Sequence, residues 1–270
     1  MISTPQSSDV ATRPVYTIAT LVNDPAQHAA MCASFRTNGF SEPQCEFVAT
    51  ANPRSAYAAL NDMLAAAHGR YVILCHQDVR LLGDDRAVLD SRLAALEALD
   101  PAWAVAGNAG GVGPGRLAMR ISDPHGDNQH VGPLPARVQS LDENFLVVKA
   151  QARVGFSRNL TGFHLYGADI CLAADIMGYT AYVIDFHLRH LSPGRKDQSF
   201  RHAEADFRAK WAAALRPRWL QTTCTLLRLG APAPERWLGR TLERPYSSLL
   251  RRTRWSHPAS AAKRPGQNQR

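Results

Sequence analysis

The sequence predicts an α/β fold in which a mostly parallel sheet is flanked by helices. Over residues 15–107, short apolar runs of strand length alternate with longer stretches that carry apolar residues at helical spacing. One of these runs, Tyr71–Cys75, is apolar throughout and then ends abruptly in His76-Gln77-Asp78. Buried parallel strands have this pattern, and open α/β sheets bind their ligands at the carboxyl edge, where such strands end.

The first half of the chain predicts four strands joined by helices. Asp24 followed by Pro25 indicates a helix start, because Asp caps the first turn and Pro fits the first helical position. Gly69 is a typical helix stop. Right-handed crossovers between the strands make them parallel neighbours. The predicted strands cover residues 15–21, 46–49, 71–75 and 103–107, and the predicted helices cover residues 25–37, 55–68 and 84–99.

The pattern changes after residue 107. Residues 108–115 are rich in glycine, and residues 121–138 hold Pro, His, Gly and Asp without periodicity, which predicts a long loop able to close over a ligand. Further strands are predicted at residues 145–148 and 181–184, and helices at residues 168–177 and 198–214. The expected organisation is a flexible N-terminus (1–13), one domain (14–215), and a basic Pro- and Arg-rich extension (216–270) that is disordered after about residue 256.

The basic charge of the chain belongs to its C-terminal part. The 270-residue chain has a net charge of +8, but residues 216–270 hold 12 Lys or Arg against 2 Asp or Glu, which leaves −2 on residues 1–215. A basic groove is therefore not required, and nucleic acid is not expected as a partner. Five cysteines without C-x-x-C spacing, no apolar run of 18 residues and no secretory signal predict a cytoplasmic protein without a transmembrane helix.

Three places in the sequence hold residues suited to chemistry. Asp78, at the end of a predicted strand, can hold a divalent cation against a diphosphate, although a turn or cap role is the ordinary one for a single Asp there. His190 can complete a metal site with Asp78, and a histidine ligand suits Mn²⁺ at least as well as Mg²⁺. Asp169, at the start of a predicted helix, can accept a proton from an attacking hydroxyl, or it can be a simple first-turn acid.

Three segments of the chain, in their order and spacing, resemble family 2 glycosyltransferases of the GT-A fold. The likeness is to the branch in which a His-Gln-Asp-Val run replaces the acidic D-x-D motif. It spans about residues 15–211 and implies a Rossmann-like GT-A domain, followed here by the basic C-terminal extension. The segments are Asn61 through Tyr71-Val-Ile-Leu-Cys-His-Gln-Asp-Val, then Leu141-Asp-Glu-Asn-Phe-Leu-Val-Val-Lys, then Gly162-Phe-His-Leu-Tyr-Gly-Ala-Asp-Ile-Cys-Leu-Ala-Ala-Asp-Ile-Met-Gly-Tyr, which is followed by His190-Leu-Ser-Pro-Gly.

The resemblance implies a nucleotide-sugar donor whose diphosphate is held by Mn²⁺ or Mg²⁺. By this likeness Asp78 binds the metal, His76 stands in place of the first acid of the motif, and His190 matches a late histidine that ligates the same metal. Asp169 matches the general base, in a motif where Ala168 replaces the family's Glu. The residues assigned to the nucleotide-sugar are Asn23, Asn52, Asn61, His76, Gln77 and Asp78.

The function implied by the resemblance is an inverting glycosyltransferase that acts on a glycan or lipid-linked acceptor, in bacterial cell-surface glycan synthesis. Residues 236–255 mix Trp and Leu with Arg, which is typical of a segment that lies on an anionic membrane surface, so a location on the inner face of the membrane is expected. A packed helix pair with a solvated basic face is the alternative for this segment. Three other functions remain open: a non-catalytic nucleotide-sugar-binding or membrane-associated protein with a degenerate site, a nucleotidyltransferase, and a nucleic-acid binder acting through the tail.

Overall fold

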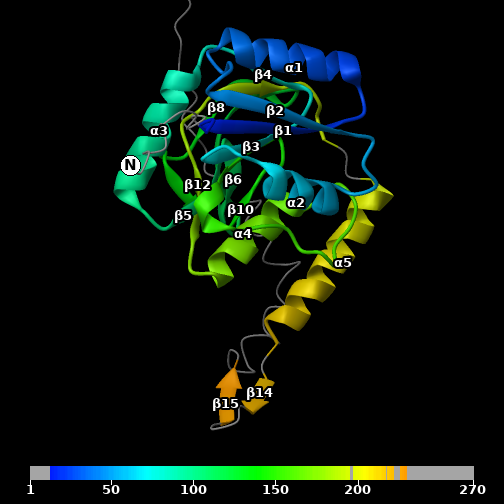
Figure 1. Ribbon diagram of the computed structural model, residues 1–270. Helices are drawn as coiled ribbons and strands as arrows, with labels where there is room; N and C mark the ends of the chain where they lie inside the picture. Colours follow the sequence, from blue (N-terminus) through cyan, green and yellow to red (C-terminus); the bar gives the residue numbers. More distant parts are fainter. Residues whose placement is uncertain (1–12, 195–196, 217, 222–225, 230–270) are drawn as a thin grey trace, which may run out of the picture. The chain divides into compact units, whose positions relative to one another are not determined.

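A seven-stranded sheet forms the centre of the protein (Figure 1). The computed structural model describes residues 13–194, 197–216, 218–221 and 226–229. The chain divides into two units, Met1–Gly230 and Ala231–Arg270, and all of the described residues lie in the first. In spatial order the central strands are β2 (Cys45–Ala51), β1 (Tyr16–Val22), β3 (Tyr71–Cys75), β11 (Phe145–Lys149), β5 (Trp103–Gly107), β12 (Thr180–Val183) and β9 (Ala136–Val138).

Most strands of this sheet run in one direction. β1 is parallel to β2 and to β3, and β12 is parallel to β5. β11 lies antiparallel between β3 and β5, and β9 is antiparallel to β12 at the edge. The strands β2, β1, β3, β5 and β12 therefore share one direction, and the prediction of a mostly parallel α/β sheet flanked by helices is confirmed.

Helices cover both faces of the seven-stranded sheet. α1 and α3 contribute to one buried cluster, and α2 and α4 contribute to another. Alternate residues of β3 divide between the clusters, with Ile73 and Cys75 in the first and Val72 and Leu74 in the second. Both faces of the strand are thus buried, which explains why its sequence is apolar throughout. The helices are α1 (Pro25–Thr37), α2 (Ala56–Ala66), α3 (Arg86–Leu99), α4 (Tyr166–Ile176) and α5 (Gln198–Ala214).

The start of α1 follows directly from its sequence. The side chain of Asp24 accepts hydrogen bonds from the backbone N–H groups of Ala26 (2.9 Å) and Gln27 (3.1 Å), and Pro25 is the first helical residue. These bonds satisfy two of the backbone donors that a helix start leaves unpaired. The predicted bounds of this helix are confirmed, and α1 begins shortly after the carboxyl end of β1.

A second, six-stranded sheet corrects one sequence expectation. Its path is β10 (Ser140–Leu141), β6 (Ala109–Gly113), β7 (Arg116–Asp123), β13 (Leu188–His190) and β4 (Val79–Leu81), and β8 (Gly126–Val131) pairs with β7. The expectation of a long loop at residues 121–138 is therefore wrong, because most of this segment belongs to β7, β8 and β9. β8 is polar and has no fully buried residue, and β6 is mostly glycine, so neither shows the alternation that marks a strand in sequence.

Glycine in β6 has a steric reason. A Cβ on Gly110 would lie 2.4 Å from the carbonyl oxygen of Ser140, so only glycine lets β10 approach β6 this closely. The same residues that weaken the strand signal in the sequence are thus the ones that allow the strands to pair.

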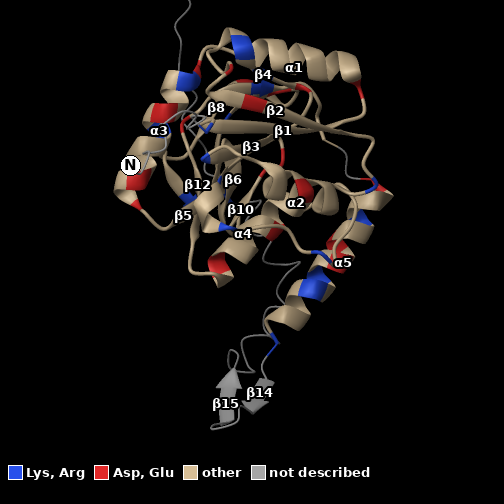
Figure 2. Ribbon diagram, viewed as in Figure 1, with Lys and Arg blue, Asp and Glu red and all other residues tan. Residues whose placement is uncertain are grey.

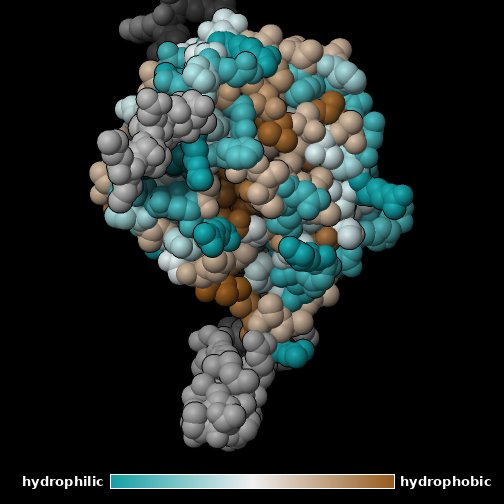
Figure 3. All heavy atoms as spheres, in the orientation of Figure 1, coloured by the Kyte–Doolittle hydropathy of each residue, from teal (hydrophilic) through white to brown (hydrophobic). Residues whose placement is uncertain are grey.

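The surface of the described protein is mixed in character. Figure 2 shows basic and acidic residues interspersed over the helices and strands, in agreement with the near-zero charge of residues 1–215. On the face seen in Figure 3, strongly hydrophobic atoms form small separate groups among hydrophilic ones. Within the described part of the chain, no helix combines the length and the hydropathy that crossing a bilayer requires.

The predictions for the two ends of the chain fall mainly outside the described residues. The expected flexible segment 1–13, the membrane-binding segment 236–255 and the disorder after about residue 256 lie there, apart from Arg13. Of the predicted extension 216–270, the structure describes Arg216 and a short antiparallel pair of strands, β14 (Arg218–Gln221) and β15 (Leu226–Leu229).

Candidate metal and substrate site

His76 and Asp78 lie in the turn that carries the chain from one sheet to the other. β3 is buried along its length and ends at Cys75, and the N–H of the next residue, His76, donates to the carbonyl oxygen of Asn144 (2.9 Å). The turn closes through a hydrogen bond from the N–H of Val79 to the carbonyl oxygen of His76 (3.2 Å). His76 therefore follows the last residue of a central strand, and Asp78 directly precedes β4 of the second sheet.

Strand pairing brings His190 to the same place. β13 runs antiparallel to β4, with His190 opposite Val79, and the N–H of Leu191 donates to the carbonyl oxygen of Asp78 (3.1 Å). His190 is 114 positions away from His76 in the sequence, yet its Nε2 lies 3.3 Å from His76 Nδ1. The second sheet thus assembles the group His76, Asp78 and His190, which we call the triad of ligand candidates.

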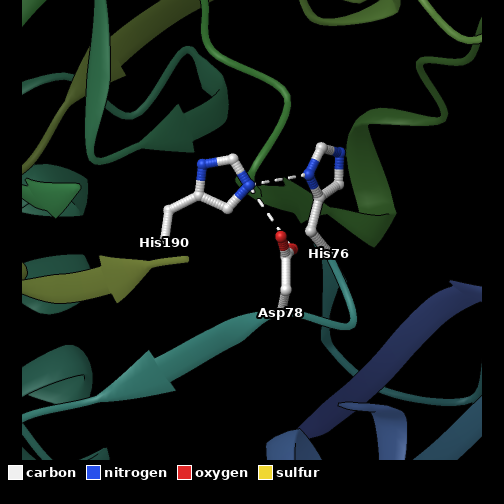
Figure 4. Close-up of side chains that lie close together, drawn as sticks. All are labelled: His76, Asp78 and His190. Atoms are coloured by element: carbon white, nitrogen blue, oxygen red, sulfur yellow. Dashed lines mark hydrogen bonds and ion pairs between the residues drawn. The ribbon is translucent and has the colours of Figure 1, made fainter. Parts of the chain in front are cut away.

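The side chains of the triad point toward one another (Figure 4). His190 Nε2 is 3.4 Å from Asp78 Oδ1, and one potential ligand atom from each of the three residues lies within 4.8 Å of the other two. The His190 and Asp78 side chains are only 11% and 18% exposed. Burial works to raise the pKa of Asp78, but the hydrogen bond and charge of His190, with smaller contributions from Ser192 and His76, outweigh it and hold this pKa well below its usual range.

Tyr166 contacts the ring nitrogen of His76 that faces away from the triad. Its hydroxyl lies 2.7 Å from His76 Nε2 and 3.3 Å from the carbonyl oxygen of Glu143. When the hydroxyl proton is directed to this carbonyl, its oxygen accepts from Nε2–H, and the lone pair of His76 is on Nδ1, toward His190. Burial and the neighbouring His190 both lower the pKa of His76, which favours the neutral ring that metal coordination requires.

The triad fits a divalent cation. Two imidazole nitrogens and one carboxylate oxygen form a mixed N/O donor set, which suits Mn²⁺ or a similar transition metal better than Mg²⁺, an ion that prefers oxygen. The bond from His76 to Tyr166 is the kind of outer contact that orients a ligating histidine. The close approach of the two imidazoles also leaves both lone-pair positions near one point in space.

Gln77 joins the triad to the loop after β1. Its Oε1 accepts the N–H groups of Asn23 (3.0 Å) and Asp24 (3.0 Å), and its Nε2 donates to Asn23 Oδ1. Asn52 lies nearby in the fold, because its N–H donates to the carbonyl oxygen of Val22 at the end of β1 (2.8 Å). Asn23 and Asn52 are both exposed, so their side chains are accessible to a ligand at this edge of the sheet.

Asn61 does not lie with the other candidates. Its Nδ2 donates to the carbonyl oxygen of Phe156 (2.9 Å), and its Oδ1 accepts the N–H of Phe156 (2.9 Å). Both ends of the amide are thus used to fix the segment before α4 against α2. A donor-binding role for Asn61 does not agree with this geometry.

Asp169 is enclosed by protein. It has no exposed surface, and its carboxylate accepts hydrogen bonds from Ser157 N–H (2.7 Å), Ser157 Oγ–H (2.7 Å) and Trp211 Nε1–H (3.0 Å). These bonds fix the segment before α4 and the end of α5 against α4. An acceptor hydroxyl cannot reach this carboxylate unless Ser157 or Trp211 moves, so its assignment as general base stays a prediction of the sequence.

An acidic pair for which the sequence predicts no role lies beside the triad. Asp142 and Glu143 connect β10 to β11, and the negative charge of Asp142 acts on His76. Burial, with the charge of Asp142 as the second cause, raises the pKa of Glu143 to about 8. In sequence, Leu141-Asp-Glu-Asn-Phe is an ordinary turn before a strand, and only the position of α4 over it reveals the contact.

Unpaired buried polar atoms mark the same edge of the sheet. Among the described residues, three buried side-chain oxygens lack a hydrogen-bond partner: Thr20 Oγ1, Asn108 Oδ1 and Asn144 Oδ1. Thr20 is in the second half of β1, Asn108 follows β5, and Asn144 precedes the antiparallel β11. All three therefore lie toward the carboxyl edge, where a bound ligand or water can supply the missing partner.

A cavity of about 250 Å³ borders the triad on the side of the β7–β8 hairpin. His190 belongs to its lining, and an ion pair between Arg189 and Asp127 (2.8 Å) crosses its wall. His125 Nε2 contacts the carbonyl oxygen of Pro193 (3.1 Å), which holds the hairpin against the segment after His190. The lining residues are Asp123, Pro124, Asp127, Arg189, His190 and Leu191.

The chain is similar in sequence to one known protein and in fold to a solved mannosyltransferase. The chain is 37% identical over 209 residues to the ATP synthase subunits region ORF 6 of Fuscovulum blasticum, a match that covers 73% of this chain and 83% of that protein. No protein-family model matches the sequence. The mannosyltransferase PcManGT from Pyrobaculum calidifontis, in complex with GDP-Man and Mn²⁺, superposes with a TM-score of 0.54 at 14% identity, over 90% of this chain and 76% of that one. This likeness shows the GT-A type of fold.

Proposed function

The chain belongs to the same family as the ATP synthase subunits region ORF 6 of Fuscovulum blasticum, and we propose that it is a metal-assisted glycosyltransferase. One observation carries the proposal. The triad of ligand candidates, His76, Asp78 and His190, lies at the carboxyl edge of a sheet whose fold resembles that of a mannosyltransferase solved with GDP-Man and Mn²⁺. Open α/β sheets bind ligands at this edge.

The residues of the edge divide into two roles in this proposal. His76 Nδ1, Asp78 and His190 Nε2 would hold the cation, which when bound offsets the negative charge of a departing nucleoside diphosphate. Gln77 keeps the β1–α1 loop next to the triad through Asn23, so the nucleoside would be gripped by Asn23 and Asn52 while the sugar lies toward Gln77. The unpaired oxygens at the edge are further contacts for hydroxyl groups.

The chemistry of the proposed reaction is a single displacement. A hydroxyl of the acceptor attacks C1 of the sugar from the face opposite the diphosphate, and the configuration at C1 is inverted. We place the chain in family 2, in the branch with a His-Gln-Asp-Val run, because Val79 completes that run and His190 joins it in space. The acceptor class that agrees with this branch is a glycan or a lipid-linked saccharide of the bacterial cell surface.

The C-terminal extension is proposed to work at a membrane. Residues 236–255, which lie outside the described residues, carry Trp and Leu among six arginines, a composition suited to an anionic lipid surface. Co-sedimentation of the full chain with phosphatidylglycerol vesicles tests this, with phosphatidylcholine vesicles as the control. Equal, low binding to both kinds of vesicle contradicts the proposal, and it also contradicts a peripheral location on the inner face of the membrane.

Release of nucleoside diphosphate from a panel of GDP- and UDP-sugars tests the enzyme assignment. We expect release that needs Mn²⁺ and stops on addition of EDTA. Asp78→Asn should lower it by ~10²-fold or more, because a metal ligand supports several kcal/mol of charge stabilisation. Asp62→Asn, an exposed acid of α2 outside the triad, is the matched control and should retain the rate of the unmodified chain.

Binding and turnover separate the alternatives. Thermal stabilisation by Mn²⁺ and a nucleotide-sugar without any turnover favours the non-catalytic binding protein. Neither stabilisation nor turnover with any donor contradicts the proposed function altogether.

A further inference from the structure

The proposed transfer requires a group that takes the proton of the acceptor hydroxyl. We propose that Glu143 is this group, an inference that rests on the proposed glycosyltransferase function. The enclosed position of Asp169 motivates the search for another base, because both of its oxygens are occupied by Ser157 and Trp211 and none of its surface is exposed. Glu143, in contrast, keeps part of its residue surface exposed, although its carboxyl is buried enough to raise its pKa.

Two backbone contacts, one of Glu143 and one of Asn144, place this turn next to the triad. Its carbonyl oxygen accepts the Tyr166 hydroxyl that also binds His76 Nε2, and the carbonyl oxygen of the following residue, Asn144, accepts the N–H of His76. The backbone of Glu143 is thus one hydroxyl away from a ligand candidate. A buried oxygen without a partner, Asn144 Oδ1, lies in the adjacent residue and is suited to a second hydroxyl of an acceptor.

The neighbouring acid, Asp142, is less suited to the task. Its Oδ1 accepts the backbone N–H (3.0 Å) and the side-chain amide of Asn144, so the carboxylate closes its own turn. Its effect on Glu143 is electrostatic, since two negative charges on adjacent residues disfavour each other. Asp142 therefore adjusts the proton affinity of Glu143, and Glu143 is the better suited of the two acids to exchange a proton.

The start of α4 holds the Glu143 carboxyl in place. Its Oε1 accepts the N–H of Gly167 (3.5 Å), and the N–H groups of Leu165 and Tyr166 also face it. A Cβ on Gly167 would lie 3.2 Å from Glu143 Cγ and 2.3 Å from the carbonyl oxygen of Leu141, so the glycine allows this close approach. The titratable groups that face the carboxyl are Asp142, Tyr166 and Tyr57.

The chemistry of these surroundings suits a proton acceptor at near-neutral pH. Burial and Asp142 raise the pKa of Glu143 to about 8, against an ordinary value of 4.5, and a base works best when its pKa lies near the operating pH. In the step itself, the acceptor O–H bond breaks and its proton moves to Glu143. The acceptor oxygen forms the new bond to C1, and the nucleoside diphosphate leaves with the electron pair of the old bond. Glu143 then returns the proton to water.

The experiment compares Glu143→Gln, Glu143→Ala and Asp142→Asn with the unmodified chain, using the donor that gives nucleoside diphosphate release. We expect Glu143→Gln to lower the turnover number by ~10²- to 10⁴-fold, the contribution typical of general-base catalysis. Mn²⁺ and donor binding, measured by thermal shift, should stay unchanged because the amide keeps the contact with α4. Formate should restore part of the turnover of Glu143→Ala, since a small carboxylate can enter the space that the side chain leaves.

Two readouts separate a base from a merely structural acid. The turnover of the unmodified chain should fall as the pH drops below about 8, and Asp142→Asn should move this limb to lower pH because it removes the charge that raises the Glu143 pKa. Turnover of Glu143→Gln within about threefold of the unmodified chain overturns the inference while the glycosyltransferase function stands. If the unmodified chain turns over no donor at all, the proposed function fails, and the role of Glu143 falls with it.

Discussion

The hydroxyl of Tyr166 offers a direct test of how the triad is built. Tyr166→Phe removes the atom that lies 2.7 Å from His76 Nε2 and 3.3 Å from the carbonyl oxygen of Glu143. The ring itself is retained, and with it the edge-on contacts to Tyr57 and Phe156. The variant therefore changes the tautomer and orientation of His76 and leaves the packing of the core almost as it was.

The expected loss is in cation affinity. Outer contacts of a ligating histidine are typically worth 10- to 100-fold in metal affinity, which corresponds to about 1.4 to 2.7 kcal/mol. Stability should change less, because a buried hydrogen bond contributes only about 0.5 to 1.5 kcal/mol net. Calorimetric titration with Mn²⁺ gives the first quantity, and urea unfolding in the absence of metal gives the second.

Tyr57→Phe is the matched control for this measurement. Tyr57 is equally buried, and its hydroxyl also donates one hydrogen bond, to the carbonyl oxygen of His164 (2.8 Å), outside the triad. It should lose similar stability and keep its Mn²⁺ affinity. If Tyr166→Phe binds Mn²⁺ as well as the unmodified chain, or if Tyr57→Phe weakens it as much, the assigned role of Tyr166 is refuted.

Three further predictions follow from the same contacts. Asp169→Asn should lower the free energy of unfolding in urea by about 2 to 3 kcal/mol, because an amide cannot accept hydrogen bonds from all three donors. The control Asp175→Asn, at an exposed position of the same helix, should change this free energy by less than about 0.5 kcal/mol, and equal losses would contradict the structural role of Asp169. The folded protein holds a proton on Glu143 up to about pH 8, whereas the unfolded chain releases it near pH 4.5, so the stability that this proton contributes is complete below pH 4.5 and is lost as the pH rises to about 8. The melting temperature of Glu143→Gln should therefore fall less steeply over this range than that of the unmodified chain, and parallel profiles would contradict the raised pKa of Glu143. Gln77→Ala should weaken nucleotide-sugar binding about 10-fold through the released Asn23 loop without changing Mn²⁺ affinity, and calorimetry showing unchanged donor binding would remove Gln77 from the donor site.

Local sequence determines the part of the fold that was predicted well. α1 begins at Pro25 because Asp24 caps it, and β3 ends at Cys75 because three polar residues follow five buried ones. α5 also has its predicted bounds, and its Trp211 is buried. In each case the signal and the structure lie within one element, so no distant contact is needed.

The second sheet was missed because its signals are not local. β6 is a strand whose glycines admit β10, and β8 is a polar edge strand, so both read as loops in sequence. The pairing of β13 with β4, which brings His190 to Asp78, joins segments about a hundred residues apart. Periodicity cannot report such pairing. His190 became a candidate because an imidazole near a sheet edge can complete a metal site with Asp78, and the family resemblance assigned it to the same metal.

The candidate site shows the same division. His76, Gln77 and Asp78 were found because polar residues end a buried strand, and the structure brings them together with Asn23 and His190. Tyr166 lies before the helix predicted at residues 168–177 and shows no signal of a site residue, and Glu143 reads as an ordinary turn acid. Their contacts with each other and with His76 depend on how α4 lies over the start of β11, which is a property of packing.

The triad also connects the two sheets of the protein. His76 follows a strand of the seven-stranded sheet, whereas Asp78 adjoins β4 and His190 ends β13, both in the six-stranded sheet. An ion coordinated by all three residues would link the two sheets, and its binding free energy would stabilise the folded state. Removal of the ion by a chelator should then weaken the contact between the two sheets first. We expect amide hydrogen exchange to become faster in β4 and β13 than in β2 and β12.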